Sequence, residues 1–332
     1  MMRPLKILTW HVHGNYLWYL SHCGHQFYLP VRHGTPGYGG RGDTFPLGDN
    51  VHDVPANEVR RLQFDCILYQ HRKHYLEDRH RLLSPEQRQL PCIYLEHDPP
   101  LEVPTGQHHW FEEANGLLVH VTPFNALMWD SSGVASKVIE HGVPYYPDRQ
   151  CHGELPRGLT AVNHLGTRGP RLGGDVFLAA RRQVPIDLVG LGSESLGGLG
   201  EVKPTKLAAF AQAYRFFFHP IRYTSLGLAV CEAMMLGMPV VGLATTEMAT
   251  VIQNGVTGYV DTSLERLIPS MRRLVVDRQE ALRLGQNARR YAQERFSMRR
   301  FVDDWNKTFA VVVGMGPRAG RSDYVASDCA YQ

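Results

Sequence analysis

The sequence predicts an α/β protein built from two domains, on three observations. Residues 214–262 read as a strand, a glycine loop, a helix and a second strand, with an aromatic run at residues 216–218 and Gly237 ending the helix. Further apolar segments of strand length are spread along the chain, with helical and loop segments between them. The length of 332 residues is more than one hydrophobic core usually serves, so two domains are expected.

The first half of the chain contains apolar segments that predict buried strands, at residues 6–10, 27–31, 66–70, 93–95 and 117–121. Gly14 follows the first of them, after His11, Val12 and His13. Residues 24–50 are rich in glycine and proline and predict a long loop around the second strand. Residues 72–83 are charged and predict a surface helix, and residues 122–129 begin another helix.

One predicted strand runs directly into a polar turn. Glu96, His97 and Asp98 follow the apolar residues 93–95, and two prolines come next. The prolines prevent a helix here, so the three polar side chains are expected on a rigid turn at the carboxyl end of a strand. Open α/β sheets bind their ligands at this end of the strands.

The second half begins after residues 144–157, where three prolines predict an interdomain linker. A strand is expected at the start of residues 159–165, followed by a glycine-rich and arginine-containing loop. A second strand at residues 184–192 and a helix at 206–213 precede the central stretch. Two charged helices are expected within residues 263–295, and the tail after Gly314 is predicted to be disordered.

Glu232 is the acid on an otherwise apolar helix beside the glycine loop. A carboxylate one turn into such a helix can accept hydrogen bonds from both hydroxyls of a ribose. The helix start itself directs backbone N–H groups and a positive dipole end toward a phosphate. The alternative is that Glu232 is a solvated helix acid with no ligand.

Composition and charge narrow the class of protein. The net charge of +3, from 35 basic and 32 acidic residues, gives no indication of nucleic-acid binding. The six cysteines are scattered without close pairs, which predicts free thiols, no zinc site and a reducing cytoplasm. No signal sequence and no membrane-spanning segment is expected, whereas peripheral contact with a membrane-borne acceptor stays open.

Many residues of the central stretch stand at the spacing of a known nucleotide-binding signature. The stretch resembles the signature of the family 4 glycosyltransferases, and the residues in register are Pro220, Gly227, Leu228, Glu232, Ala233, Met234, Gly237, Pro239, Val240, Val241 and Glu247. Eight residues before Glu232 the family has an acid, whereas this chain has Thr224. The resemblance covers roughly residues 5–310 and implies the GT-B fold, in which two Rossmann-like domains face each other across a cleft.

The resemblance implies a retaining, hexosyltransferase-type glycosyltransferase that needs no metal and no further cofactor. Such an enzyme moves a sugar from a nucleotide diphosphate sugar to a hydroxyl of a carbohydrate, lipid-linked or small-molecule acceptor. Two alternatives stay open: a GT-B epimerase or hydrolase, and a non-catalytic nucleotide-sugar binding protein. Thr224 and His164, at family positions for an acid and a base, motivate the second alternative.

Roles for individual residues follow from the same resemblance. His97 matches a cleft histidine that contacts the transferred sugar. Arg168 matches a diphosphate-binding Lys-Gly pair, with Arg171 in reserve, because Asn163–His164 replaces the family's Gly-Arg. The implied catalytic residues are His97, Arg168 and Glu232, and the implied donor-binding residues are Gly14, Arg168, Arg171, Thr224, Ser225, Leu226, Gly227, Leu228 and Glu232.

The expected domain boundaries complete the prediction. Residues 1–150 form the acceptor-side domain, and a final helix at about residues 299–314 crosses back onto it. Residues 151–298 form the domain that binds the nucleotide sugar, and residues 315–332 form the tail.

Overall fold

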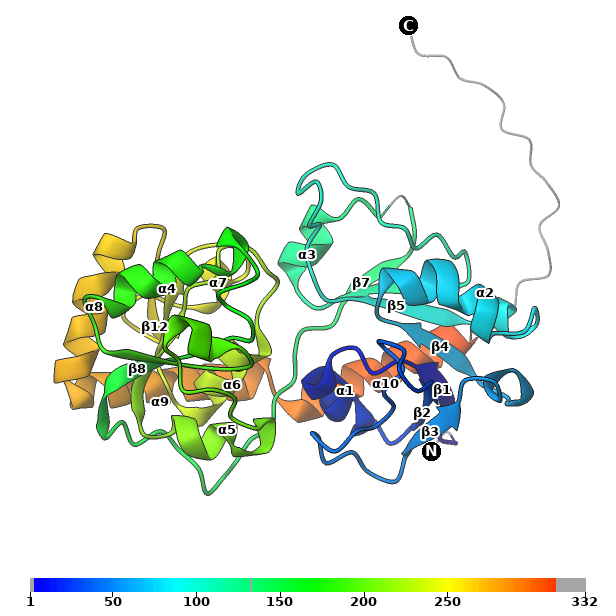
Figure 1. Cartoon of the computed structure of the whole chain (residues 1–332), viewed down its shortest axis with the longest axis horizontal. Helices are drawn as coiled ribbons and strands as arrows, with labels where there is room; N and C mark the ends of the chain where they lie inside the picture. Colours follow the sequence, from blue (N-terminus) through cyan, green and yellow to red (C-terminus); the bar gives the residue numbers. More distant parts are fainter. Residues whose placement is uncertain (1–2, 132, 315–332) are drawn as a thin grey trace, which may run out of the picture.

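The computed structural model describes residues 3–131 and 133–314, which form two α/β domains side by side (Figure 1). The sheet of the first domain has seven parallel strands in the order β3-β2-β1-β4-β5-β6-β7. The strands are β1 (Lys6–Thr9), β2 (Gln26–Val31), β3 (Val51–Pro55), β4 (Cys66–Tyr69), β5 (Cys92–Glu96), β6 (Gly116–His120) and β7 (Ser136–Val138). The predicted tail at residues 315–332 lies outside the described residues.

The helices of the first domain are short. They are α1 (Gly14–Ser21), α2 (Arg79–Leu82) and α3 (Pro123–Met128). The charged segment predicted as one surface helix forms instead a π-helical turn at His74–Asp78 that continues into α2. The difference has a packing cause, because His74 stacks on Trp10 with ring centroids 4.7 Å apart and Tyr75 is buried.

The sheet of the second domain has five parallel strands in the order β12-β11-β10-β8-β9. The strands are β8 (Leu155–Ala161), β9 (Ile186–Val189), β10 (Tyr214–His219), β11 (Val240–Leu243) and β12 (Gly258–Asp261). The helices around it are α4 (Gly174–Arg181), α5 (Pro204–Ala211), α6 (Leu228–Leu236), α7 (Met248–Val251), α8 (Leu264–Val276) and α9 (Arg278–Arg295).

The last helix, α10 (Met298–Gly314), leaves the second domain and packs on the first (Figure 1). Phe301, Trp305 and Phe309 on its inner face are fully buried. Trp305 Nε1 donates a hydrogen bond of 3.1 Å to Tyr16 Oη in α1. The chain therefore crosses between the domains twice, at the linker after β7 and at the start of α10.

Both sheets reverse their strand order beside the first strand of the domain, between β1 and β4 and between β8 and β10. Ligands of open α/β sheets bind at such switch points, outside the carboxyl ends of the strands. A ligand site is therefore expected at the loops after β1, β8 and β10. Within the described residues, no helix is long and apolar enough to cross a membrane, and the five cysteines are buried and unpaired.

A candidate nucleotide-sugar site in the interdomain cleft

A cleft with roughly 510 Å³ of open space lies between the domains at these loops. Its first-domain wall is formed by the end of the β1 loop, the start of α1 and Phe45. Its second-domain wall comes from the carboxyl ends of β8 and β9, the first turn of α5 and the first two turns of α6. Two of the predicted site residues that line it, Gly14 and Glu232, face it from opposite walls.

Glu232 is partly buried in the second turn of α6 and does not extend into solvent. Its Oε1 accepts a 2.6 Å hydrogen bond from Tyr19 Oη and a 3.2 Å bond from Asn15 Nδ2, both on α1 of the other domain. Among the described residues its Oε2 accepts no hydrogen bond. The expectation of a solvated or ligand-only acid missed these two contacts, because they join residues more than 200 positions apart.

The loop before α6 offers unused backbone donors. The N–H groups of residues 224–227 make no hydrogen bond within the described part of the chain. The carbonyl of Leu226 instead accepts a 2.7 Å bond from His141 Nε2, and Tyr223 Oη donates 3.1 Å to the carbonyl of Pro100. The loop is thus held by its side chains and carbonyls, which leaves its N–H groups and the positive end of α6 for an anion.

His97 lies on the turn after β5, behind the first-domain wall of the cleft. Its ring centroid is 4.1 Å from that of His13 and 4.9 Å from that of Tyr16, and both of these residues line the cleft. Burial, with His13 and His141 nearby, lowers the pKa of His97 well below its ordinary value, so the ring is neutral at pH 7. His97 is thereby brought to the cleft without itself lining the open space.

The tautomer of His97 follows from its neighbour. Gln70 Nε2 donates to Thr9 Oγ1 at 3.0 Å and to the carbonyl of Trp10 at 3.2 Å, so Gln70 Oε1 is an acceptor. His97 Nε2 lies 3.1 Å from that oxygen and must carry the proton. Its Nδ1 is left as an acceptor for a hydroxyl group.

The other two polar residues of the predicted turn have structural partners. Glu96 ends β5 and is buried against His109 Nε2 at 3.1 Å, and burial raises the pKa of Glu96 to about 8. The Asp98 carboxylate lies 3.9 Å from Arg171 Nη1 of the second domain. Of the three, His97 contacts two residues that line the cleft, and its Nδ1 has no hydrogen bond in the described part of the chain.

The two arginines proposed for the diphosphate differ in their surroundings. Arg168 is exposed on the loop after β8, makes no ion pair within the described residues, and is within electrostatic reach of His13 across the cleft. Arg171 already faces Asp98. Asn163, at the position of the family's glycine, is structural, since its Oδ1 accepts a 2.9 Å bond from the N–H of Leu191.

Gly14 stands at the start of α1 under the ring of Phe45. A Cβ atom at Gly14 would overlap that ring. The long glycine-rich loop predicted at residues 24–50 therefore reaches the cleft, and its aromatic side chain covers the backbone of Gly14. A glycine is needed here for close approach and not for an unusual φ angle.

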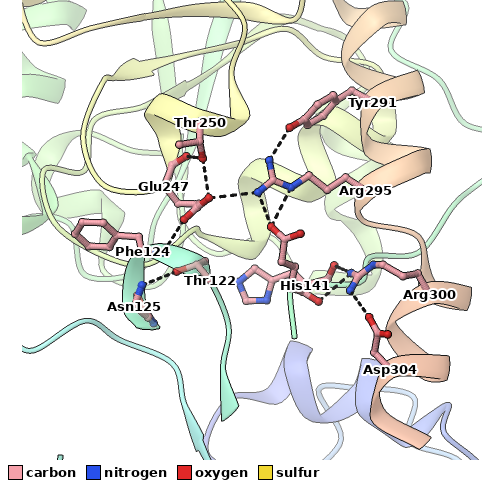
Figure 2. Close-up of polar contacts among 11 residues, drawn as sticks. Thr122, Phe124, Asn125, His141, Glu247, Thr250, Tyr291, Arg295, Arg300 and Asp304 are labelled. Atoms are coloured by element: carbon pink, nitrogen blue, oxygen red, sulfur yellow. Dashed lines mark hydrogen bonds and ion pairs between the residues drawn. The ribbon is translucent and has the colours of Figure 1, made fainter. Parts of the chain in front are cut away.

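Glu247, the last acid of the family pattern, joins the domains beside the cleft (Figure 2). Its Oε2 accepts a 2.9 Å bond from the N–H of Phe124 at the start of α3, and its Oε1 accepts from Thr250 Oγ1 at 2.6 Å. Arg295 Nη2 lies 3.3 Å from Glu247 Oε1 and also holds Glu140 on the linker. Figure 2 shows this network spanning α3, α7 and α9.

Sequence reasoning missed Asn15, Tyr19 and the interdomain role of Glu247. Asn15 and Tyr19 stand four residues apart, so they share one face of α1. The four-residue spacing on a helix after the first strand is a sequence signal that Asn15 and Tyr19 act together. It does not identify their partner, because Glu232 lies in the other domain.

Comparisons with known proteins agree with this architecture. Residues 192–291, which include the loop before α6, Glu232 and Glu247 but neither Arg168 nor Arg171, match the family model described as glycosyl transferases group 1. No curated protein sequence matches the chain.

Solved structures resemble the whole chain at low sequence identity. A sucrose-phosphate synthase from Thermosynechococcus elongatus has 16% identity and a TM-score of 0.69, over 95% of this chain and 100% of that one. The Anabaena protein HepE, solved in complex with UDP, has 13% identity and a TM-score of 0.62, over 93% of this chain and 100% of that one. AviGT4, a glycosyltransferase involved in avilamycin A biosynthesis, has 14% identity and a TM-score of 0.61, over 94% of this chain and 99% of that one. The chain therefore has the GT-B fold, and its second domain contains a segment of the group 1 glycosyl transferase type.

Proposed function

We propose that this protein is a glycosyltransferase that moves a sugar from a nucleotide diphosphate sugar to an acceptor hydroxyl. The observation that carries the proposal is Glu232, whose side chain lines the cleft and whose Oε2 accepts no hydrogen bond within the described residues. An acid so placed suits the two hydroxyls of a ribose. The match of residues 192–291 to the group 1 glycosyl transferases and the UDP bound by HepE support the same class of donor.

Different parts of the donor would contact different residues of the cleft. Glu232 would hold the ribose, and Arg168 with the unbonded N–H groups of residues 224–227 would stabilise the diphosphate as its charge grows. His97 would accept a hydrogen bond from a sugar hydroxyl through Nδ1. Arg171 is the second candidate cation, since Asp98 already neutralises part of its charge.

The finer features of the reaction rest on the resemblance to family 4. We propose a hexosyl donor, retention of anomeric configuration and catalysis without a metal ion. The acceptor is a carbohydrate, a lipid-linked molecule or a small molecule, and a membrane-borne acceptor would need peripheral contact only. A cytoplasmic location is proposed with it.

The test is a panel of UDP-, GDP- and ADP-sugars, scored by release of the nucleoside diphosphate. Calorimetry with the matching diphosphate then compares Glu232→Ala with the wild type and with Glu265→Ala, an exposed acid on α8. Loss of hydrogen bonds to a charged group costs about 1.5 to 3 kcal/mol, so Glu232→Ala should bind roughly tenfold to a hundredfold more weakly. Equal affinity of Glu232→Ala and the wild type would remove the ribose assignment.

A non-catalytic nucleotide-sugar binding protein is the second candidate. It is favoured by Thr224 and His164, which stand where the family has an acid and a base. Such a protein would bind a diphosphate in the calorimeter and release none from any donor. A hydrolase or epimerase would release or convert the donor without an acceptor, which product analysis by NMR separates from transfer.

A further inference from the structure

The carboxylate proposed for the ribose is held from the opposite domain. Tyr19 Oη and Asn15 Nδ2 both donate to the same oxygen of Glu232, Oε1. Tyr19 is almost fully buried, so its 2.6 Å bond is shielded from water. The geometry of Glu232 is therefore set by α1 and not by α6 alone.

The arrangement leaves one oxygen of Glu232 available. Oε1 has two donors, whereas Oε2 has none within the described residues, and the Glu232 side chain lines the cleft together with Gly14. A carboxylate can accept several hydrogen bonds, so anchoring at Oε1 fixes the direction of the remaining lone pairs. Because the carboxylate is already ordered, binding of a ligand hydroxyl at Oε2 costs little further rotational entropy.

We propose that Tyr19, assisted by Asn15, is a positioning residue that orients Glu232 for the ribose and makes nucleotide binding depend on closure of the two domains. The inference rests on the proposed function and adds to it the residues that prepare the site. Opening of the cleft would separate α1 from α6 and release Glu232. Nucleotide affinity is then a property of the closed arrangement and not of the second domain alone.

The ionisation of Glu232 gives the proposal a measurable consequence, which is the pH dependence of nucleotide binding. Burial raises the pKa of Glu232, and the hydrogen bonds from Tyr19 and Asn15 bring it part of the way back. The other titratable groups that face Glu232 are Tyr146 and Cys231, and burial raises the pKa of each, so neither is charged near neutral pH. Ionised Glu232 is the form that accepts from a ribose, so nucleotide affinity falls as pH drops through its pKa. Removing the Tyr19 hydroxyl raises that pKa further and moves the acid limb of binding to higher pH.

The experiment measures Kd by calorimetry for UDP, GDP and ADP with the full chain, over a mildly acidic to neutral pH series. The variants are Tyr19→Phe and Asn15→Ala. Tyr214→Phe is the matched control, because Tyr214 Oη also donates to a carboxylate, that of Asp187 at 3.0 Å, within the second domain. For the tightest-binding diphosphate, Tyr19→Phe should raise Kd roughly tenfold at neutral pH and shift the acid limb upward. Asn15→Ala should do the same to a smaller extent, and Tyr214→Phe should do neither.

Two outcomes overturn the inference. Unchanged Kd and an unshifted acid limb in Tyr19→Phe would make the contact structural only, and a lower Kd would mean that α1 competes with the ribose for Glu232. Glu232→Ala separates these results from failure of the proposed function. If Glu232→Ala weakens binding and Tyr19→Phe does not, only the positioning role is lost. If no diphosphate binds the wild type, both fall together.

Discussion

At the scale of single residues, Thr224 and His97 are the two candidates for orienting the transferred sugar, one from each domain. Thr224 stands where an acid is expected, and its side chain makes no hydrogen bond within the described residues. A neutral hydroxyl forms hydrogen bonds about half as strong as those of a carboxylate, so this loop should hold the sugar less firmly than an acid would. His97 has a fixed tautomer and a free Nδ1, and should therefore carry more of the sugar's orientation.

This assignment predicts unequal effects of two alanine substitutions. His97→Ala should lower kcat on the best donor by roughly a hundredfold, the loss expected for one well-placed polar contact in the transition state, with little change in the affinity for the bare diphosphate. Thr224→Ala should lower kcat by less. Steady-state kinetics and calorimetry on both variants make the comparison. A larger kcat loss in Thr224→Ala, or loss of diphosphate binding in His97→Ala, would contradict it.

The sequence indicated the side chains of the site better than their partners. Glu232, Gly14 and His97 could be chosen as candidates because each follows a strand or stands alone in an apolar helix, and those patterns are local. Tyr19 and Glu247 could not be assigned, because their partners are set by how two domains meet. The glycine after Arg168 ranks it ahead of Arg171 in the sequence, and the structure adds that Arg171 Nη1 lies 3.9 Å from the Asp98 carboxylate.

At the scale of elements, the central strands and the edge strand β9 were predictable, whereas the edge strands β3, β7 and β12 were not. β4, β5 and β10 are continuous apolar runs because both of their faces are covered. β3 at Val51–Pro55 lies at the sheet edge and follows a glycine-rich loop. Its buried residues, Val51 and Val54, are three positions apart, so no alternation of apolar residues marked it as a strand. Its pairing with β2 comes from tertiary structure.

The contact of Phe45 with Gly14 predicts that the long loop and α1 are energetically coupled. Gly14→Ala should displace the Phe45 ring and destabilise the protein by about 1 to 3 kcal/mol, as overpacking does. Phe45→Ala removes the obstruction. In a double-mutant cycle by urea unfolding, Gly14→Ala should therefore cost less in the Phe45→Ala background than in the wild type. Equal costs in the two backgrounds would mean that the loop moves away freely.

At the scale of the whole molecule, two interdomain contacts near the cleft involve elements that carry proposed site residues. Tyr223 joins the loop before α6 to Pro100, three residues beyond His97. Tyr19 joins the helix that begins at Gly14 to Glu232. The width of the cleft and the position of its polar groups are thus fixed by the same contacts, so a change in domain orientation should change ligand binding.

Substitution of Glu247 tests whether domain orientation controls ligand binding, because Glu247 joins the domains without lining the open space of the cleft. Glu247→Ala removes the acceptor for the N–H of Phe124 and one partner of Arg295, which keeps Glu140. The free energy of unfolding should fall by about 1 to 3 kcal/mol, the cost of leaving a buried donor unsatisfied. The variant should also bind diphosphate more weakly, and its radius of gyration in X-ray scattering should increase.

The control is Glu294→Ala, because Glu294 is exposed next to Arg295. This variant should leave the free energy of unfolding, the diphosphate affinity and the radius of gyration unchanged. A Glu247→Ala protein that is less stable yet keeps the scattering profile and the diphosphate affinity of the wild type would show that Glu247 supports the fold without setting the closure of the cleft.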